Sequence, residues 1–183
     1  MPPKVKADRD SILNAALKVA EDEGLSAITA QSVSSVLGMS VAPLFREFRT
    51  VEELRTAAVE KIILFHSQYL KEYPPEESAF LTYGLAYIHF AREYPHLFET
   101  IMQPRRSGLN EQKSVLPAFV VNCLADEGAL NSEDAKELLF HIWIYTHGLA
   151  CLAYNGSLAL TKEEEKTLLV TAFQAFLKHH NKG

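Results

Sequence analysis

The sequence predicts an all-α protein, and three observations support this. Apolar side chains recur with the 3.6-residue period of a helix, and the period-2 alternation of strands is missing. The 183 residues contain neither an internal repeat nor a low-complexity segment. Apolar residues make up 48% and charged residues 22%, as in ordinary globular proteins. This length allows one domain or two small ones.

Three short helices are expected in the first 50 residues. An apolar stripe over residues 9–23, followed by Gly24 at a usual helix end, predicts the first. A second helix is expected over 29–37, with Thr29 as its N-cap. After a Gly-Met-Ser turn, a third is expected over 40–48, beginning at a serine that can cap it.

Three further helices should follow. The sequence Thr50-x-x-Glu53 has the form of a capping box and opens a helix expected over 50–73. Helices over 75–94 and 95–103 come next, because a proline suits the first turn of a helix and ends the one before it.

The rest of the chain is expected to hold one loop and three more helices. The segment 104–112 is the best loop candidate, and a helix over 114–127 ends at a glycine. An asparagine can cap a long apolar helix over 131–155. A second capping box, Thr-x-x-Glu, opens the final helix over 161–179.

Other features argue against several classes of protein. Cys123 and Cys151 lie in apolar segments without paired or metal-ligand spacing, so both are expected in the core. The N-terminus lacks the apolar run of a signal peptide, which favours a reducing cytoplasm. A membrane helix over 139–154 is disfavoured by its histidines and acidic flank. His141 and His147 are six residues apart and do not share a helix face, and no hydrolase, metalloprotease or phosphate-loop motif occurs. We therefore expect no catalytic residue, metal or cofactor.

Charge alone does not indicate a nucleic-acid-binding protein. The net charge is −5, and residues 1–55 hold seven basic and eight acidic side chains. The pattern of helices indicates the opposite, because two short helices around a tight glycine turn make a helix-turn-helix. Leu44 and Phe48 can pin its second helix inward, which leaves the face with Arg46 open to the DNA major groove.

Residues 9–60 carry a specific set of side chains at characteristic spacing: Ile12, Ala15-Ala16-Leu17, Gly24, Thr29, Val33, Gly38-Met39-Ser40, Leu44-Phe45, Phe48 and Glu52-Glu53-Leu54. In these residues the chain resembles the TetR family of transcriptional regulators. The resemblance implies a helix-turn-helix DNA-binding domain over 1–55 and a helical ligand-binding and dimerisation domain over 56–183. It also implies a repressor that binds a palindromic operator as a homodimer and is released by a small, mainly apolar effector.

The DNA-contacting side chains are expected on the outer surface of the helix-turn-helix. The candidates are Thr29, Gln31, Ser40, Val41, Ala42, Phe45, Arg46, Arg49 and Thr50. Lys4, Lys6 and Arg9 are further candidates for phosphate contacts.

One feature departs from the family pattern. Val41, Phe45 and Val51 stand where the family usually has Lys, Tyr and Lys, so three groups that could meet a phosphate are missing. This leaves open a second hypothesis, a helical ligand-binding or interaction module with weak or lost DNA binding.

Two later segments, Ala91–Phe98 and Trp143–Ala150, also resemble the regulatory domain of this family. The 131–155 helix is apolar nearly all round, and the last helix carries an apolar stripe, so pairing with symmetry mates predicts a four-helix dimer interface. The candidate interface residues are Leu138, Ile142, Tyr145, Leu149, Leu152, Leu169, Phe173 and Phe176.

Aromatic and sulfur side chains are frequent in the middle of the chain. The family binds small molecules among these helices, and an aromatic cavity with a few polar groups suits an apolar effector. The candidate lining residues are Phe65, Tyr69, Tyr87, Phe90, Phe98, Met102, Phe119, Asn122, Trp143 and His147. For any one of them, a purely structural role in the core is the more common alternative.

Overall fold

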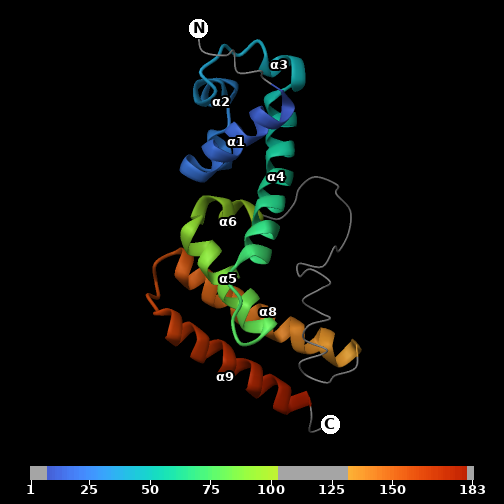
Figure 1. Ribbon diagram of the computed structural model, residues 1–183, viewed down its shortest axis with the longest axis vertical. Helices are drawn as coiled ribbons and strands as arrows, with labels where there is room; N and C mark the ends of the chain where they lie inside the picture. The colour runs from blue at the N-terminus through green and yellow to red at the C-terminus, as the bar shows by residue number, and fades with distance from the viewer. Residues whose placement is uncertain (1–7, 103–131, 181–183) are drawn as a thin grey trace. The chain divides into compact units, whose positions relative to one another are not determined.

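A computed structural model describes residues 8–102 and 132–180, and every regular element in these stretches is helical (Figure 1). The all-α prediction is confirmed. The elements are α1 (Arg9–Glu23), the 3-10 helix η1 (Leu25–Ala27), α2 (Ala30–Val36), α3 (Leu44–Glu47), α4 (Val51–Glu72), α5 (Ala79–Glu93), α6 (Pro95–Met102), α8 (Ser132–Tyr154) and α9 (Lys162–His180).

Some sequence-based expectations concern residues outside the described part of the chain. These are the loop over 104–112, the helix over 114–127, the asparagine cap at 131, and the positions of Lys4, Lys6, Phe119, Asn122 and Cys123.

Contacts between Cα atoms divide the described chain into two units. The first unit contains residues 8–68 and 94–102, and the second contains 69–93 and 132–180. Helix α4 has residues in both. The predicted functional boundary at residue 55 stays a prediction.

Local side-chain hydrogen bonds set several helix ends where the sequence predicts them. Thr29 caps α2. At the start of α4, the Glu53 N–H donates to Thr50 Oγ1 at 3.1 Å. At the start of α9, the Glu164 N–H donates to Thr161 Oγ1 at 3.3 Å, and the Glu164 carboxylate accepts from the Thr161 N–H at 2.8 Å. The second capping box is therefore confirmed, because both reciprocal bonds are present.

Two helices begin later than expected. α3 begins at Leu44 rather than directly after the serine at 40, since Pro43 has no N–H to donate and disfavours helical geometry in the residue before it. α5 begins at Ala79 instead of Pro75. There Ser78 Oγ accepts from the N–H of residue 81 at 3.2 Å, so a serine cap replaces the proline start.

The first unit has a core of fully buried apolar side chains from its helices and the segments that join them. They include Ile12, Ala16, Ile28, Val33, Leu44, Phe48, Leu54, Ile62, Leu97 and Phe98. Within this unit α1 packs against α2, η1 and α6.

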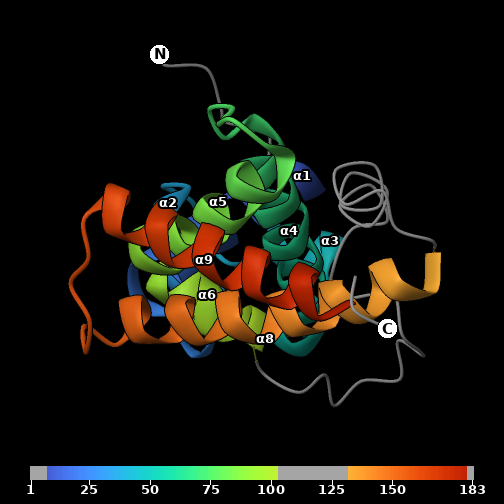
Figure 2. The same ribbon diagram turned by 90° about the horizontal axis from the view of Figure 1, so that it is seen from below.

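The second unit is built on α5, which packs against both α8 and α9 (Figures 1 and 2). Gly84 permits the close approach of α5 and α9, because a Cβ atom there would lie 3.0 Å from Leu169 Cδ1. Leu85, Phe90 and Leu138 are fully buried in this unit.

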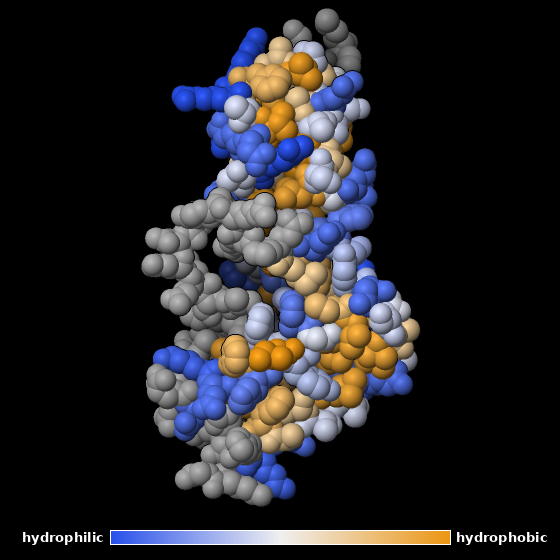
Figure 3. Space-filling model, turned by 180° about the vertical axis from the view of Figure 1, so that it is seen from behind, coloured by the Kyte–Doolittle hydropathy of each residue, from blue (hydrophilic) through white to orange (hydrophobic). Residues whose placement is uncertain are grey.

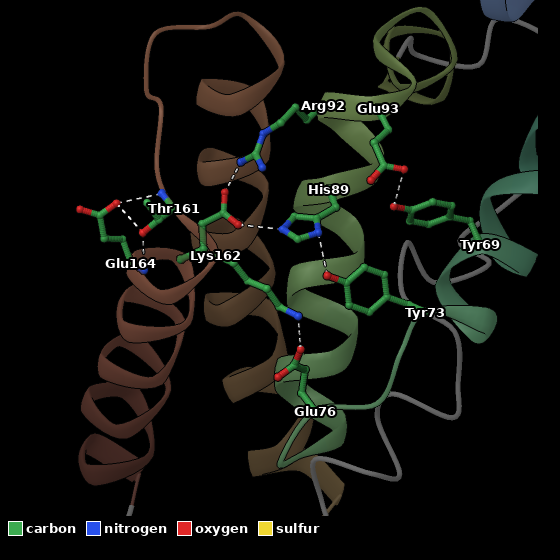
Figure 4. Close-up of polar contacts among 10 residues, drawn as sticks. Tyr69, Tyr73, Glu76, His89, Arg92, Glu93, Thr161, Lys162 and Glu164 are labelled. Atoms are coloured by element: carbon green, nitrogen blue, oxygen red, sulfur yellow. Dashed lines mark hydrogen bonds and ion pairs between the residues drawn. The ribbon is translucent and has the colours of Figure 1, made fainter.

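A buried carboxylate joins α9 to α5. The Glu165 side chain is 1% exposed and accepts from Arg92 and from His89 Nε2, the latter at 2.9 Å. His89 Nδ1 in turn lies 2.7 Å from the Tyr73 hydroxyl (Figure 4). A buried charge of this kind is tolerated only when it is paired and hydrogen-bonded.

We expect Arg92→Met to lower the free energy of unfolding by about 2 kcal/mol, because it leaves the Glu165 carboxylate buried without its guanidinium. This is below the range of about 3–5 kcal/mol for fully buried pairs, since Arg92 is partly exposed. Urea unfolding of Arg92→Met, Glu165→Met and the double variant measures the free energy of unfolding. The double variant should lose less stability than the two single variants lose together, because they share one interaction.

The matched control is Lys18→Met, which removes an exposed pair with Asp22 and should cost about 0.5 kcal/mol or less. An Arg92→Met variant as stable as this control would show that the buried pair does not stabilise the second unit.

Candidate DNA-binding and ligand-binding sites

The turn between α2 and α3 depends on a glycine. Gly38 has φ +64°, a left-handed conformation that side chains with a Cβ rarely adopt. Its N–H donates to the Ser35 carbonyl at 3.1 Å, and the Met39 N–H donates to the Ser34 carbonyl at 3.0 Å. These two bonds form a Schellman motif, which closes α2 and redirects the chain into α3.

The inner face of α3 is held by apolar burial and by one arginine. Leu44 and Phe48 are fully buried. The Arg9 guanidinium lies over the Phe48 ring at 4.2 Å and donates to the Glu47 carbonyl at 3.0 Å. Arg9, a candidate for a phosphate contact, is therefore used to hold α3 on α1, which spacing along the sequence could not reveal.

The outer face of this helix-turn-helix is exposed. All nine candidate DNA-contacting residues, from Thr29 to Thr50, are exposed side chains of the first unit. Two of them are large and apolar, Val41 at 40% and Phe45 at 46% exposure. Arg46 and Arg49 supply positive charge in the same segment. The surface thus combines apolar contact groups with donors for phosphate or base edges.

In the second unit the structure brings together three of the candidate ligand-binding residues. The Tyr87 hydroxyl lies 3.0 Å from His147 Nδ1, and the Trp143 ring stacks on the His147 ring at 5.3 Å. Cys151 Sγ lies 3.5 Å from His147 Nε2, so a cysteine expected only in the core joins this cluster. The i, i+4 spacing of the three α8 residues, which places them on one helix face, could have indicated this.

Burial sets the protonation of the Tyr87–His147 cluster. It lowers the pKa of His147 and raises the pKa values of Tyr87 and Cys151. A negative charge on Cys151 would raise the Tyr87 pKa further. The cluster is therefore neutral at neutral pH and supplies hydrogen-bond donors and acceptors rather than charge.

Two buried polar atoms of α8 have no hydrogen-bond partner among the described residues, Trp143 Nε1 and Thr146 Oγ1. Buried polar groups are nearly always satisfied in folded proteins. The indole N–H of Trp143 is thus a donor suited to a polar atom of a bound molecule.

The other candidate ligand residues are spread over both units. Phe65, Phe98 and Met102 belong to the first, and Tyr69 and Phe90 to the second. Phe90 and Phe98 are completely buried, which agrees with the structural role weighed for each aromatic residue.

Four candidate dimer-interface residues are covered by the chain itself: Leu138, Ile142, Leu149 and Leu169 are buried. The apolar side chains that α8 leaves exposed are Phe140, Ile144 and Leu152, at 55%, 49% and 40%. Because α8 is apolar nearly all round, its sequence did not reveal which face packs on α5.

The remaining candidates for the interface have contacts within the second unit. Phe173 is half-buried and stacks on Phe80 at 4.8 Å, and Phe176 lies 5.6 Å from the His141 ring. Tyr145 is half-buried.

Residues 80–175, more than half of the chain, match the family described as tetracyclin repressor-like, C-terminal domain. With the helical fold and the helix-turn-helix of the first unit, this match shows that the chain belongs to the TetR family of transcriptional regulators. No curated protein matches the chain.

None of the helices in the described residues is long and apolar enough to cross a membrane. In the same residues, no group of three or more His, Cys, Asp or Glu side chains is placed to hold a metal ion.

Gly38→Ala should destabilise the protein by about 1–2 kcal/mol, because alanine resists the left-handed conformation. No atom lies within 4 Å of the added methyl group, so the cost comes from the backbone. Gly148→Ala is the matched control, since it adds a methyl group in open space on α8 and should stabilise by up to about 1 kcal/mol. Thermal unfolding of both variants measures the difference, and equal effects would exclude the backbone explanation.

Proposed function

We propose that this chain is a repressor that binds a palindromic DNA operator as a homodimer and releases it when a small, mainly apolar effector binds. The observation that carries the proposal is the outer face of the helix-turn-helix, on which all nine candidate contact residues are exposed. TetR family membership supports the same function.

DNA contacts are proposed to divide by chemistry. Val41 and Phe45 would meet thymine methyl groups in the major groove, and Arg46 would bond a guanine edge or a phosphate. Arg49 and the N–H groups at the start of α4 would bind phosphates of the DNA backbone, because a helix N-terminus attracts phosphate.

Dimerisation is proposed to use the exposed side of α8. Phe140, Ile144 and Leu152 are separated by multiples of four residues and therefore lie along one side of the helix. On the face of the molecule that Figure 3 shows, apolar side chains (orange) are exposed among polar ones (blue). Large apolar side chains exposed on one side of a helix suit an interaction surface.

The effector is proposed to bind beside Tyr87, Trp143 and His147. Aromatic surface with a few neutral polar groups suits a mainly apolar molecule, and Trp143 Nε1 offers one donor to it. Coupling to DNA would pass through α4, which has residues in both units. Because such coupling is reciprocal, operator DNA should weaken effector binding by the same factor.

The second hypothesis is a helical ligand-binding or interaction module with weak or lost DNA binding. The apolar residues Val41, Phe45 and Val51 favour it, since each replaces a residue that could contact phosphate. Failure of the purified protein to retard any DNA would support this alternative.

Val51→Lys should tighten binding to all DNA sequences and steepen the log–log dependence of affinity on salt by about 1 per subunit, because each added phosphate contact contributes about 0.9 to that slope.

Arg46→Ala should instead cost roughly 1–3 kcal/mol of binding free energy at one operator position if Arg46 contacts a base edge. Fluorescence anisotropy over a salt series, on operator and mutated operator, measures both. A uniform loss for Arg46→Ala with a shallower slope would assign Arg46 to phosphate instead.

Ile144→Glu should dissociate the dimer, because it places two charges in the centre of the proposed apolar contact. Analytical ultracentrifugation at micromolar concentration measures the change. The control is Leu64→Glu, an equally drastic change at an exposed leucine of α4. Wild-type protein that sediments as a folded monomer, or an Ile144→Glu variant that remains dimeric, would contradict the proposed interface.

A further inference from the structure

The second unit contains a pocket of about 330 Å³ apart from the proposed effector site. Its lining comes from the end of α4, the following turn and the end of α5, and consists of Tyr69, Glu72, Tyr73, Pro74 and Glu93. None of these residues belongs to the Tyr87–Trp143–His147 cluster.

Two aromatic rings and two carboxylates give this pocket its chemistry. The Tyr69 and Tyr73 rings lie 6.2 Å apart and are tilted by 47° to one another. The Tyr69 hydroxyl donates to Glu93 Oε2 at 3.0 Å, which holds that carboxylate beside the ring (Figure 4). Among the described lining residues, none is basic.

A cation already lies near one of these rings. Lys162 Nζ is 5.9 Å from the centre of the Tyr73 ring, and its charge is compensated by Glu76 Oε1 at 2.6 Å. Of the carboxylates around Tyr73, Glu76 also pairs with Lys166, and Glu165 pairs with Arg92. Burial is the largest cause of the raised pKa of Tyr73, and the charges of Glu76, Glu165 and Glu93 raise it further against the opposing effect of Lys162.

Aromatic faces attract cations through their quadrupole, most strongly for weakly hydrated ammonium groups. We infer that this pocket binds a small organic ammonium ion, with its alkyl groups against Tyr69 and Tyr73 and its charge compensated by Glu72 and Glu93. Tyr69 is also a candidate residue for an apolar effector, but two carboxylates in the lining favour a cation over a neutral molecule. The inference does not depend on DNA binding.

The direct test is titration of the full chain with choline and, separately, with 3,3-dimethylbutan-1-ol, its neutral isostere of the same shape. Choline should bind at least tenfold more tightly in NMR or calorimetric titrations. Equal binding of the two compounds, or no binding of choline at millimolar concentration, would overturn the inference.

Variants locate the binding. Glu93→Gln and Tyr73→Leu should each weaken choline binding at least threefold, whereas Tyr69→Phe, which keeps the ring and the Glu93 charge but removes the hydroxyl that holds Glu93, should weaken it less than Glu93→Gln does. Glu163→Gln is the matched control, because it removes an exposed glutamate of α9 that does not line this pocket. If Tyr73→Leu fails to fold, Glu93→Gln alone tests whether choline binds in this pocket. A Glu93→Gln variant that binds choline as tightly as Glu163→Gln would show that this pocket is not the site.

Discussion

Burial of Leu44 and Phe48 is the constraint on which the proposed DNA-binding surface depends. α3 has only four residues, too few for an isolated helix to be stable in water. Its position is therefore set by these two side chains and by the Arg9 guanidinium over the Phe48 ring. Because the apolar face is used inward, the opposite face with Val41, Phe45 and Arg46 is left for a partner. The surface proposed to meet DNA thus has two exposed large apolar side chains, Val41 and Phe45, beside its cationic ones.

In the second unit, a close helix contact and a buried ion cluster fix α9 against α5. Gly84 lets Leu169 approach the α5 backbone. The buried Glu165 carboxylate accepts hydrogen bonds from Arg92 and His89, because an unpaired charge there would be costly. With α5 covering the inner face of α8, the apolar residues of α8 that remain exposed are those of its outer side. The same packing places Tyr87 beside His147, and Phe140 of the proposed dimer surface stacks on Trp143 at 6.4 Å, so the proposed effector site and the proposed dimer surface adjoin on one helix.

Features that depend on nearby residues were predictable from the sequence. The caps at Thr29 and at Thr161 with Glu164 are confirmed because each involves residues three apart. The predicted start of α5 was wrong, since both a proline and a serine can begin a helix and the sequence does not show which of them does. Contacts between distant residues were not predictable: Arg92 and Glu165 are separated by 73 positions, and nothing in either segment marks the pair. The exposure of the nine candidate DNA-contacting residues could be predicted, and the i, i+4 spacing on α8 could have indicated the place of Cys151, whereas the orientation of α8 could not be predicted.

The central claim is that the exposed face of α3 recognises DNA. The most direct measurement is selection from a random duplex pool by the purified protein, followed by sequencing of the retained DNA. The account predicts enrichment of one palindromic sequence whose half-sites lie about one helical turn, or a multiple of it, apart. The enrichment should be lost when Phe45 and Arg46 are both replaced by alanine in a protein that still folds. Retention of no DNA, or equal selection by the double variant, would contradict the claim.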